Sequence, residues 1–292
     1  MYMAYKAIEQ SQSFAVAHCN FCLRGEESDG DEDFVRTWCG EHGIRCFVRR
    51  FDTVAYASRH GVSIEMAARE LRYGWFAELC SEHGFTELRV AHNANDNAET
   101  LILNLLRGTG TRGLRGMSPR REFIKGIDIA RPLLDTSRAE IERWMNERGL
   151  AWREDRTNAE SEYKRNRIRN DIFPLFEQIN PSFLQTLGRD MEHFAQVDSI
   201  AEDYYREALE KVLVSTPDEV LPSLSIPALL ELKHWKYVLW RVLEPYSLNR
   251  ETFEKLTELL VSGRTISGKV FQGPAHIVRI RKKTLSVCLR SE

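Results

Sequence analysis

The chain has 292 residues, a length typical of two domains, and its 41 Lys and Arg nearly balance its 43 Asp and Glu. Apolar residues make up 42% and charged residues 29%, as in globular proteins, which excludes disordered and low-complexity chains. No apolar run approaches the roughly 20 residues of a membrane-spanning helix, and the first residues lack the pattern of a secretory signal. We therefore expect a cytoplasmic protein.

The six cysteines give little sign of a metal site. Only Cys19 and Cys22 have a C-x-x-C spacing, and no second pair or nearby His completes a zinc quartet. Reduced thiols are the favoured interpretation, and a redox or metal pair at Cys19 and Cys22 is the alternative. The sequence predicts no metal held by the protein itself.

Short apolar runs alternate with helical patterns over about the first 110 residues. The apolar runs predict three strands, at 14–17, 45–51 and 88–91. Ser28 can cap a helix that ends at Gly43, Ser63 can cap a second that ends at Gly84, and another helix begins near Asn95. This alternation predicts an α/β fold with a parallel sheet flanked by helices.

The pattern changes at Ser137, which has the spacing of a capping box with Glu140. The polar stretch 152–163 predicts a loop. Amphipathic helices are expected at roughly 166–178, 183–213, 226–245 and 250–262. Apolar and polar residues alternate over 269–289, which predicts a small hairpin or a three-stranded sheet. We place the boundary at Asn180, so that 1–180 form the α/β domain and 181–292 a mainly α-helical domain.

A dense group of polar residues, His92-Asn-Ala-Asn-Asp96-Asn-Ala-Glu99, follows the third expected strand. Ligands of parallel α/β sheets bind beyond the carboxyl ends of the strands. On a helix His92, Asp96 and Glu99 can share one face. They could hold a divalent metal, orient an amine or move protons. A polar helix N-terminus is the alternative, which the spacing alone favours.

A turn rich in glycine and arginine comes next, Arg107-Gly-Thr-Gly-Thr-Arg112-Gly-Leu-Arg115-Gly-Met. Glycine lets the backbone approach a ligand closely, and arginine offers a fork of donors that matches phosphate oxygens. The pattern predicts contact with phosphate or nucleic acid, and a solvated loop is the alternative. A net charge near zero does not exclude such a partner, because the local distribution of charge decides.

A second basic cluster is Tyr163-Lys-Arg165-Asn-Arg167-Ile-Arg169. On a helix Arg165 and Arg169 share one face, and Tyr163 could stack on a base. The cluster is typical of a surface that grips an RNA backbone. A solvated helix face is an equally good interpretation.

These stretches resemble the tRNA(Ile)-lysidine synthetases of the PP-loop ATP pyrophosphatase group, over roughly residues 10–185. In chain order, the matching segments are H-C-N-F-C-L-R-G-E-E-S at 18–28, A-R-E-L-R-Y at 68–73, the polar group at 92–100, L-R-G-T-G-T-R-G-L at 106–114, R-P-L-L at 131–134 and the motif within 154–169. The polar group and the glycine-arginine turn are the most specific of these.

The resemblance implies a PP-loop domain and a two-step ligation. ATP would activate the wobble cytidine of an isoleucine tRNA with a CAU anticodon, and free L-lysine would then displace AMP and leave lysidine. By this resemblance Asp96 and Glu99 bind or deprotonate lysine, and His92 supports the adenylate. Arg72 would face the activated cytidine or phosphate, and His18 would lie near the ATP.

The resemblance also implies roles in binding for four arginines and for the second domain. The residues expected to steady the anticodon region are Arg107, Arg112, Arg165 and Arg167. The helical second domain would take part in binding tRNA or substrate, and a homodimer is a candidate assembly. Asn95 and Asn97 replace residues that are often Asp and Gln in the family, which disfavours a metal site of two carboxylates. We therefore expect Mg²⁺ to be held by the phosphates of ATP.

The phosphate loop of the family, S-G-G-x-D-S, does not occur in these 292 residues. A shortened chain and a numbering that closes over missing residues are the favoured explanations, because the other site residues are present. A degenerate copy that binds tRNA without activating it is the third. Two alternative functions therefore stand beside the ligase. One is another PP-loop tRNA enzyme of the cytidine thiolase type, and the other is a non-catalytic tRNA-binding module.

Overall fold

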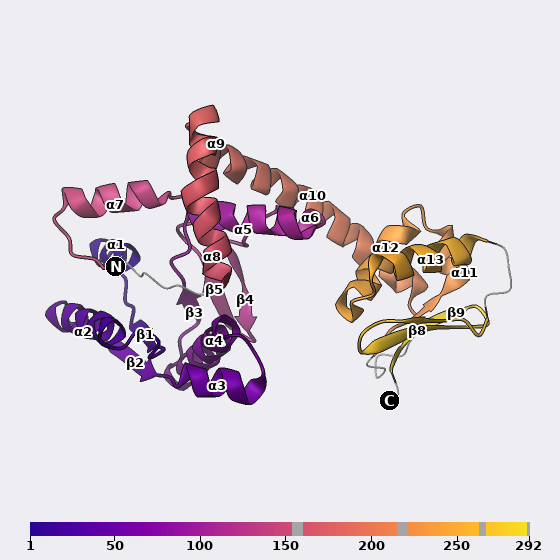
Figure 1. Cartoon of the computed structure of the whole chain (residues 1–292), viewed down its shortest axis with the longest axis horizontal. Helices are drawn as coiled ribbons and strands as arrows, with labels where there is room; N and C mark the ends of the chain where they lie inside the picture. Colours follow the sequence, from indigo (N-terminus) through magenta and orange to yellow (C-terminus); the bar gives the residue numbers. More distant parts are fainter. Residues whose placement is uncertain (154–159, 215–220, 263–266, 291–292) are drawn as a thin grey trace. The chain divides into compact units, whose positions relative to one another are not determined.

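The computed structural model describes residues 1–153, 160–214, 221–262 and 267–290, with the side chains of 160–163 excluded. Two compact units are present, Met1–Ala195 and Gln196–Glu292, and the division falls within the long helix α10 (Phe183–Val212). The strands of the first unit are β1 (Val16–Asn20), β2 (Cys46–Arg50), β3 (Glu87–Arg89), β4 (Arg120–Ile124) and β5 (Ile127–Ala130). Its helices before α10 are α1 (Tyr2–Glu9), α2 (Glu26–Glu41), α3 (Thr53–His60), α4 (Ile64–His83), α5 (Ala94–Arg107), α6 (Thr111–Leu114), α7 (Arg138–Glu147), α8 (Glu160–Arg167), the π-helical turn η1 (Ile168–Ile172) and α9 (Phe173–Ile179), as Figure 1 shows.

The strands of the first unit form two small sheets. β1 and β2 pair in parallel, with Val16 opposite Cys46. β3 and β5 also pair in parallel, with Leu88 opposite Ile129, and β4 is antiparallel to β5. The parallel pairs and the helices around them confirm the predicted α/β class. The β4–β5 hairpin was not expected from the sequence, because β4 begins with three charged residues and has no apolar run.

Local capping signals place several helices where the sequence predicts them. The Ser63 hydroxyl accepts a hydrogen bond from the Met66 backbone N–H, and Gly84 ends α4 in the left-handed conformation. Ser137 and Glu140 form the expected capping box of α7. The expected cap at Ser28 is wrong, since α2 begins two residues earlier.

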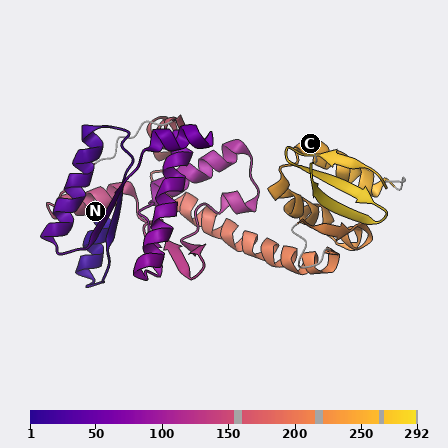
Figure 2. The ribbon, with the colours of Figure 1, turned by 90° about the horizontal axis from the view of Figure 1, so that it is seen from below.

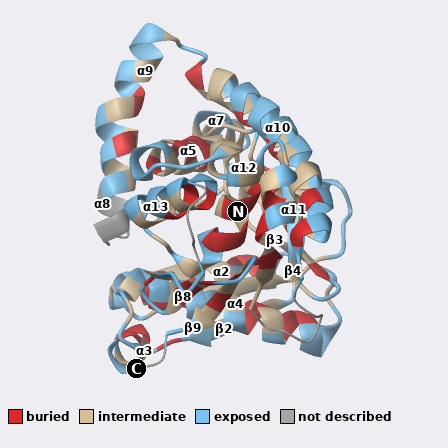
Figure 3. Ribbon diagram, turned by 90° about the vertical axis from the view of Figure 1, so that its right-hand side faces the viewer, coloured by how far each residue is buried: buried red, intermediate tan, exposed pale blue. Residues whose placement is uncertain are grey.

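Two apolar clusters of the first unit fix the elements around the candidate site. One packs α4 against β1 and β2 through residues such as Phe51 and Trp75. The other packs α5 against η1, α9 and α10 through Ala98, Ile168 and Phe183. Figure 3 shows the buried residues of α5 and α4. The second cluster brings the basic segment that ends in η1 against the helix that carries the acidic residues.

The second unit is an antiparallel sheet covered by helices on one face (Figure 2). The sheet order is β6-β9-β8-β7, from β6 (Ser223–Ser225), β7 (Val270–Gln272), β8 (His276–Arg281) and β9 (Thr284–Leu289). The remaining helices are α11 (Ile226–Glu231), α12 (Trp235–Leu243), the short η2 (Glu244–Tyr246) and α13 (Arg250–Val261). The expected C-terminal hairpin is present, and β6 adds a strand to it. The helix expected over 226–245 is interrupted between α11 and α12.

Within the described ranges, no helix is long and apolar enough to cross a membrane. The loop predicted at 152–163 falls mainly on residues outside the described ranges, and α8 begins at Glu160.

Candidate functional site

The acidic residues of the site lie at the beginning of α5, directly after β3. Asn93 caps this helix, and its side chain accepts a hydrogen bond from the Asp96 N–H at 3.1 Å. Asp96 completes the capping box, since its Oδ2 accepts a hydrogen bond from the Asn93 N–H at 3.0 Å. The other oxygen, Oδ1, lies 3.8 Å from Nη2 of Arg169. One oxygen of Asp96 therefore stabilises the helix, and the second faces a basic side chain.

Glu99 lies one turn further along α5 and is 1% exposed. Its Oε1 accepts a hydrogen bond from Nε of Arg169 at 2.8 Å, and Nη2 of Arg169 lies 2.7 Å from the same oxygen. Burial raises the pKa of Glu99, and the charge of Arg169 opposes that rise. Oε2 is buried and has no hydrogen-bond partner among the described residues. The carboxylate thus keeps one acceptor that is unused and shielded from solvent.

His92 precedes α5, so it does not share a helical face with Asp96 and Glu99 in the way that the spacing suggested. Burial lowers the pKa of His92, Asp96 opposes this, and the charges of Arg131, Arg165 and Arg72 lower it further. Its Nδ1 is buried, without a hydrogen-bond partner in the described part of the chain. The ring is therefore a neutral imidazole near several guanidinium groups.

Arg72 and Arg131 supply positive charge near His92 from different elements. Arg72 is exposed on α4, with its guanidinium 5.1 Å from the centre of the Phe21 ring. Arg131 follows β5 and is 8% exposed, and its Nη1 donates a hydrogen bond to the Ser118 carbonyl at 2.7 Å. Arg72 was expected to face the activated cytidine or phosphate, and its charge acts on His92. Arg131 was recognised only as part of a motif, and its burial could not be read from the sequence.

The glycine-arginine turn is fastened to α5 by two amide side chains. Oδ1 of Asn97 accepts a hydrogen bond from the Met117 N–H at 2.7 Å. Nδ2 of Asn104 donates a hydrogen bond to the Gly113 carbonyl at 2.9 Å. The helix that carries the acidic residues therefore also carries the turn.

The two predicted binding arginines of this turn, Arg107 and Arg112, are exposed. Arg107 lies in the last turn of α5 and Arg112 in the short helix α6. Their guanidinium groups belong to the same structural unit as Asp96 and Glu99. The structure thus places an arginine-bearing turn at the far end of the helix that begins with the acidic group.

The basic segment at 164–169 reaches the acidic group through some of its arginines. Arg169 binds Glu99 directly, and the charge of Arg165 acts on both His92 and Glu99. Arg167 instead lies on the exposed side, with its Nε 3.1 Å from Asp171. The side chain of Tyr163 and the part of the motif at 154–159 lie outside the described residues. The role of Arg169 was missed, although it belongs to the basic run that the sequence singled out.

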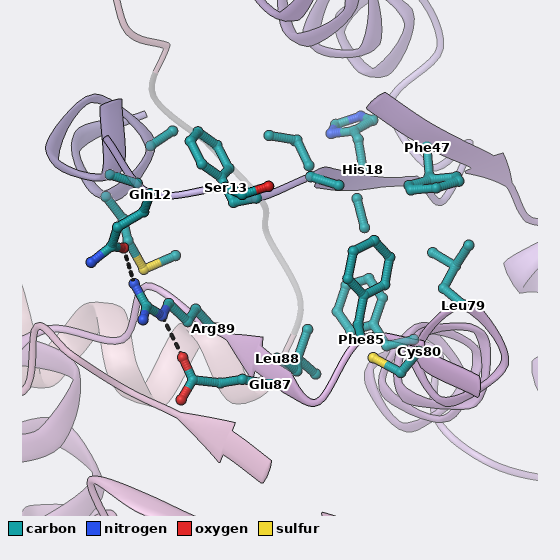
Figure 4. A pocket seen from close by; sticks show the side chains of 18 of the residues that line it. Gln12, Ser13, His18, Phe47, Leu79, Cys80, Phe85, Glu87, Leu88 and Arg89 are labelled. Carbon is teal, nitrogen blue, oxygen red and sulfur yellow. Dashed lines mark hydrogen bonds and ion pairs between the residues drawn. The ribbon is translucent and has the colours of Figure 1, made fainter. Parts of the chain in front are cut away.

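His18 lies in β1 and lines a cavity of about 720 Å³ between β1 and β3, shown in Figure 4. The other lining residues are mainly apolar and include Phe47, Leu79 and Leu88. Polar side chains, Gln12, Glu87 and Arg89, lie at one end. His18 is thus placed on a cavity wall.

The described residues contain no group of three or more His, Cys, Asp or Glu side chains that could hold a metal ion. The carboxylates of Asp96 and Glu99 each already use an oxygen, in the capping box and in the pair with Arg169. These donors do not fit a magnesium site built by the protein alone, which normally needs octahedral oxygen ligands.

Known proteins resemble this chain over most of its length. It is 39% identical over 259 residues to the tRNA(Ile)-lysidine synthase of Parabacteroides distasonis, a match of 89% of this chain and 56% of that protein. The corresponding enzyme of Bacteroides thetaiotaomicron is 41% identical over 244 residues, covering 84% of this chain and 55% of the relative. That of Chlorobaculum tepidum is 44% identical over 196 residues, covering 67% and 58%. The chain spans about half the length of these curated relatives.

The fold is also similar to a solved structure, the U34-tRNA thiolase NcsA of Methanococcus maripaludis. The TM-score is 0.55 at 18% identity, and the match covers 67% of this chain and 68% of the other. The family model of the PP-loop domain matches residues 1–176, which contain the acidic group and the basic segments described above. The chain therefore belongs to the PP-loop domain family.

Proposed function

We propose that the protein ligates lysine to C2 of the wobble cytidine of an isoleucine tRNA with a CAU anticodon, at the expense of ATP. The observation that carries this proposal is the buried Glu99 oxygen Oε2, which has no hydrogen-bond partner among the described residues. A buried carboxylate with one unused acceptor suits an ammonium group, and Asp96 adds a second carboxylate near the same arginine, since Arg169 contacts both residues. The arginines around it suit the phosphates and the RNA that must meet that amine.

In the first step, O2 of the cytidine attacks the α-phosphorus of ATP and pyrophosphate leaves. The new C2–O–P linkage makes C2 electrophilic. Negative charge develops on the phosphoryl oxygens, and nearby positive charge would stabilise it. Arg72 and Arg131 would supply that charge, because both act electrostatically on His92. The neutral imidazole of His92 can donate or accept a hydrogen bond at the adenylate without adding charge.

In the second step, an amine of lysine attacks C2, the C2–O bond breaks, and AMP leaves with the oxygen. The amine must first lose a proton, and the product nitrogen loses a second. Asp96 and Glu99 would bind the ammonium and accept these protons. The raised pKa of Glu99 suits this role, because burial makes the carboxylate a stronger base than an exposed one.

The tRNA must present an unstacked cytidine, and unstacking costs a few kcal/mol. Contacts between the protein and the RNA backbone have to offset this cost. Arg107 and Arg112 on the turn, with Arg165 and Arg167 on the basic segment, would supply those contacts. ATP would bring Mg²⁺ on its phosphates, and His18 would lie near the nucleotide.

The test is the transfer of labelled lysine to RNA. The purified chain is incubated with ATP, labelled lysine and tRNA(Ile) that carries the CAU anticodon, and the RNA is then isolated. ATP-dependent labelling supports the ligase, and tRNA with uridine at the wobble position is the control that should remain unlabelled. Binding of tRNA without labelling would instead support the non-catalytic module.

A further inference from the structure

The glycine-arginine turn, residues 107–117, ends at a glycine that is packed tightly against two neighbouring helices. Gly116 has a φ of +66°, a left-handed backbone conformation that side-chain-bearing residues rarely adopt. A Cβ atom at this position would overlap Sδ of Met191 and would lie 2.5 Å from Oδ1 of Asn97. Glycine at position 116 therefore allows both side chains to reach the backbone of the turn.

The two side chains that meet Gly116 are themselves held in place. Asn97 is 7% exposed and Met191 is 4% exposed. Asn97 belongs to α5, directly after Asp96, and its Oδ1 accepts the hydrogen bond of 2.7 Å from the Met117 N–H. Met191 belongs to the first part of α10, which packs on α5 (Figure 1). The end of the turn is therefore fixed by one buried residue from each helix.

The middle of the turn is fixed by a second set of close contacts. A Cβ atom at Gly113 would overlap Oγ1 of Thr109, so the beginning of the turn can approach α6 because residue 113 has no side chain. The Gly113 carbonyl accepts a hydrogen bond of 2.9 Å from Nδ2 of Asn104. Arg112 directly precedes Gly113 in α6 and is exposed. An exposed guanidinium is thus carried on a backbone that has little freedom to move.

We propose that Asn97 is a positioning residue for RNA binding, which acts through the backbone of Gly116 and Met117 to hold the glycine-arginine turn in the shape that meets RNA phosphates. This inference rests on the proposed role of Arg107 and Arg112 in binding tRNA. A turn that is already ordered loses little conformational entropy when its ligand binds. The fixed shape therefore raises the affinity for RNA without adding a contact to it.

The variant Asn97→Ala tests this inference, because it removes the acceptor of the Met117 N–H and leaves every arginine in place. We expect the Kd for tRNA(Ile) to rise about tenfold, as for the loss of one buried hydrogen bond. The slope of log affinity against log salt should stay the same, because the number of phosphate contacts does not change. Amide exchange at Met117 should become faster. Asn146→Ala, at an exposed position of α7, is the matched control and should leave all three quantities unchanged.

Gly116→Ala disturbs the same contact from the other side. Its Cβ would displace Oδ1 of Asn97, so we expect a similar rise in Kd and an unchanged salt slope. A purely structural role would lower the folded fraction, and with it the binding stoichiometry, while Kd stayed the same. That result, a reduced salt slope, or no binding of tRNA by the unchanged chain would overturn the proposal. These titrations need neither ATP nor lysine, so failure of the proposed ligation would leave their outcome readable.

Discussion

Glu99 and Arg169 form a partly buried ion pair that joins the acidic helix α5 to the basic turn η1. Nε and Nη2 of Arg169 lie 2.8 Å and 2.7 Å from the same oxygen, Oε1. Glu99 is 1% exposed, so its charge is largely removed from water and depends on this partner. The pair fixes the carboxylate while leaving Oε2 without a partner among the described residues, and it holds the acidic group against the basic segment.

We expect Arg169→Ala to destabilise the fold in a pH-dependent way. The loss of the guanidinium leaves a buried carboxylate unpaired, which costs about 3 kcal/mol at pH 8. The pKa of Glu99, already raised by burial, would rise further. A raised carboxyl pKa gives stability that is present below the ordinary value for Glu and is lost as pH rises through the folded value. Urea unfolding should therefore show that Arg169→Ala lowers the free energy of unfolding less at pH 5 than at pH 8.

Arg167→Ala is the matched control for this prediction. Arg167 pairs with Asp171 at the surface, where both side chains are more than half exposed. Such a pair contributes about 0–1 kcal/mol. If Arg169→Ala lowers the free energy of unfolding equally at pH 5 and pH 8, or as little as Arg167→Ala does, the buried pair does not have the role given to it here.

We expect His92→Gln to reduce the loss of stability that accompanies a decrease in pH. Burial lowers the pKa of His92, so the folded chain keeps the ring neutral while the unfolded chain protonates it near pH 6.5. The corresponding stability is present above that pH and is lost as pH falls through the folded value. Melting temperatures at pH 7.5 and 5.5 should differ less for His92→Gln than for the unchanged chain. The exposed His193 provides the control His193→Gln, which should keep the original difference.

Asp96→Asn should abolish transfer of lysine and leave tRNA binding largely intact. Asparagine keeps an oxygen that can accept the hydrogen bond from the Asn93 N–H, so α5 should still begin correctly and lose about 1 kcal/mol or less. The charge that binds and deprotonates the amine is lost. Labelled-lysine incorporation and filter binding of tRNA measure the two effects. Asp33→Asn, at an exposed position of α2, is the control, and unchanged turnover in Asp96→Asn would refute the assigned role.

The double variant with Arg107→Ala and Arg112→Ala should weaken tRNA binding without loss of stability, because both side chains are exposed. Each lost phosphate contact should reduce the dependence of log affinity on log salt by about 1. Titrations at several salt concentrations measure the slope. Arg59→Ala, an exposed arginine at the end of α3, should leave it unchanged. If the salt slope is unchanged in the double variant, these two arginines do not contact the RNA phosphates.

Local signals in the sequence predicted much of this structure. Ser63 and Ser137 cap helices because a side-chain oxygen satisfies a nearby backbone N–H, a relationship within four residues. The residue types left a structural alternative open for the acidic group, the glycine-arginine turn and the basic segment, and it was the family resemblance that predicted them as one site. The pairing of Glu99 with Arg169 could not be predicted, because the two residues are 70 positions apart and meet through the packing of α5 on η1.

Two other features of the site could not be decided from the sequence. One oxygen of Asp96 serves the capping box and the other faces Arg169, so the residue has a structural task and a charge interaction at once. From the spacing alone, helix capping and ligand binding were competing interpretations of this residue. The division of the strands into two sheets with a cavity between them depends on which edges pair, and apolar runs alone do not specify that.

The central claim is that Asp96 and Glu99 hold an amine where it can reach an RNA base steadied by neighbouring arginines. The most direct measurement is mass spectrometry of the nucleosides of tRNA(Ile) after incubation with the chain, ATP and lysine. The account predicts a wobble nucleoside with the mass of cytidine plus lysine less one water, with AMP and pyrophosphate released in equal amounts. An unmodified cytidine in tRNA that is bound by the chain, under conditions where ATP is also bound, would contradict it.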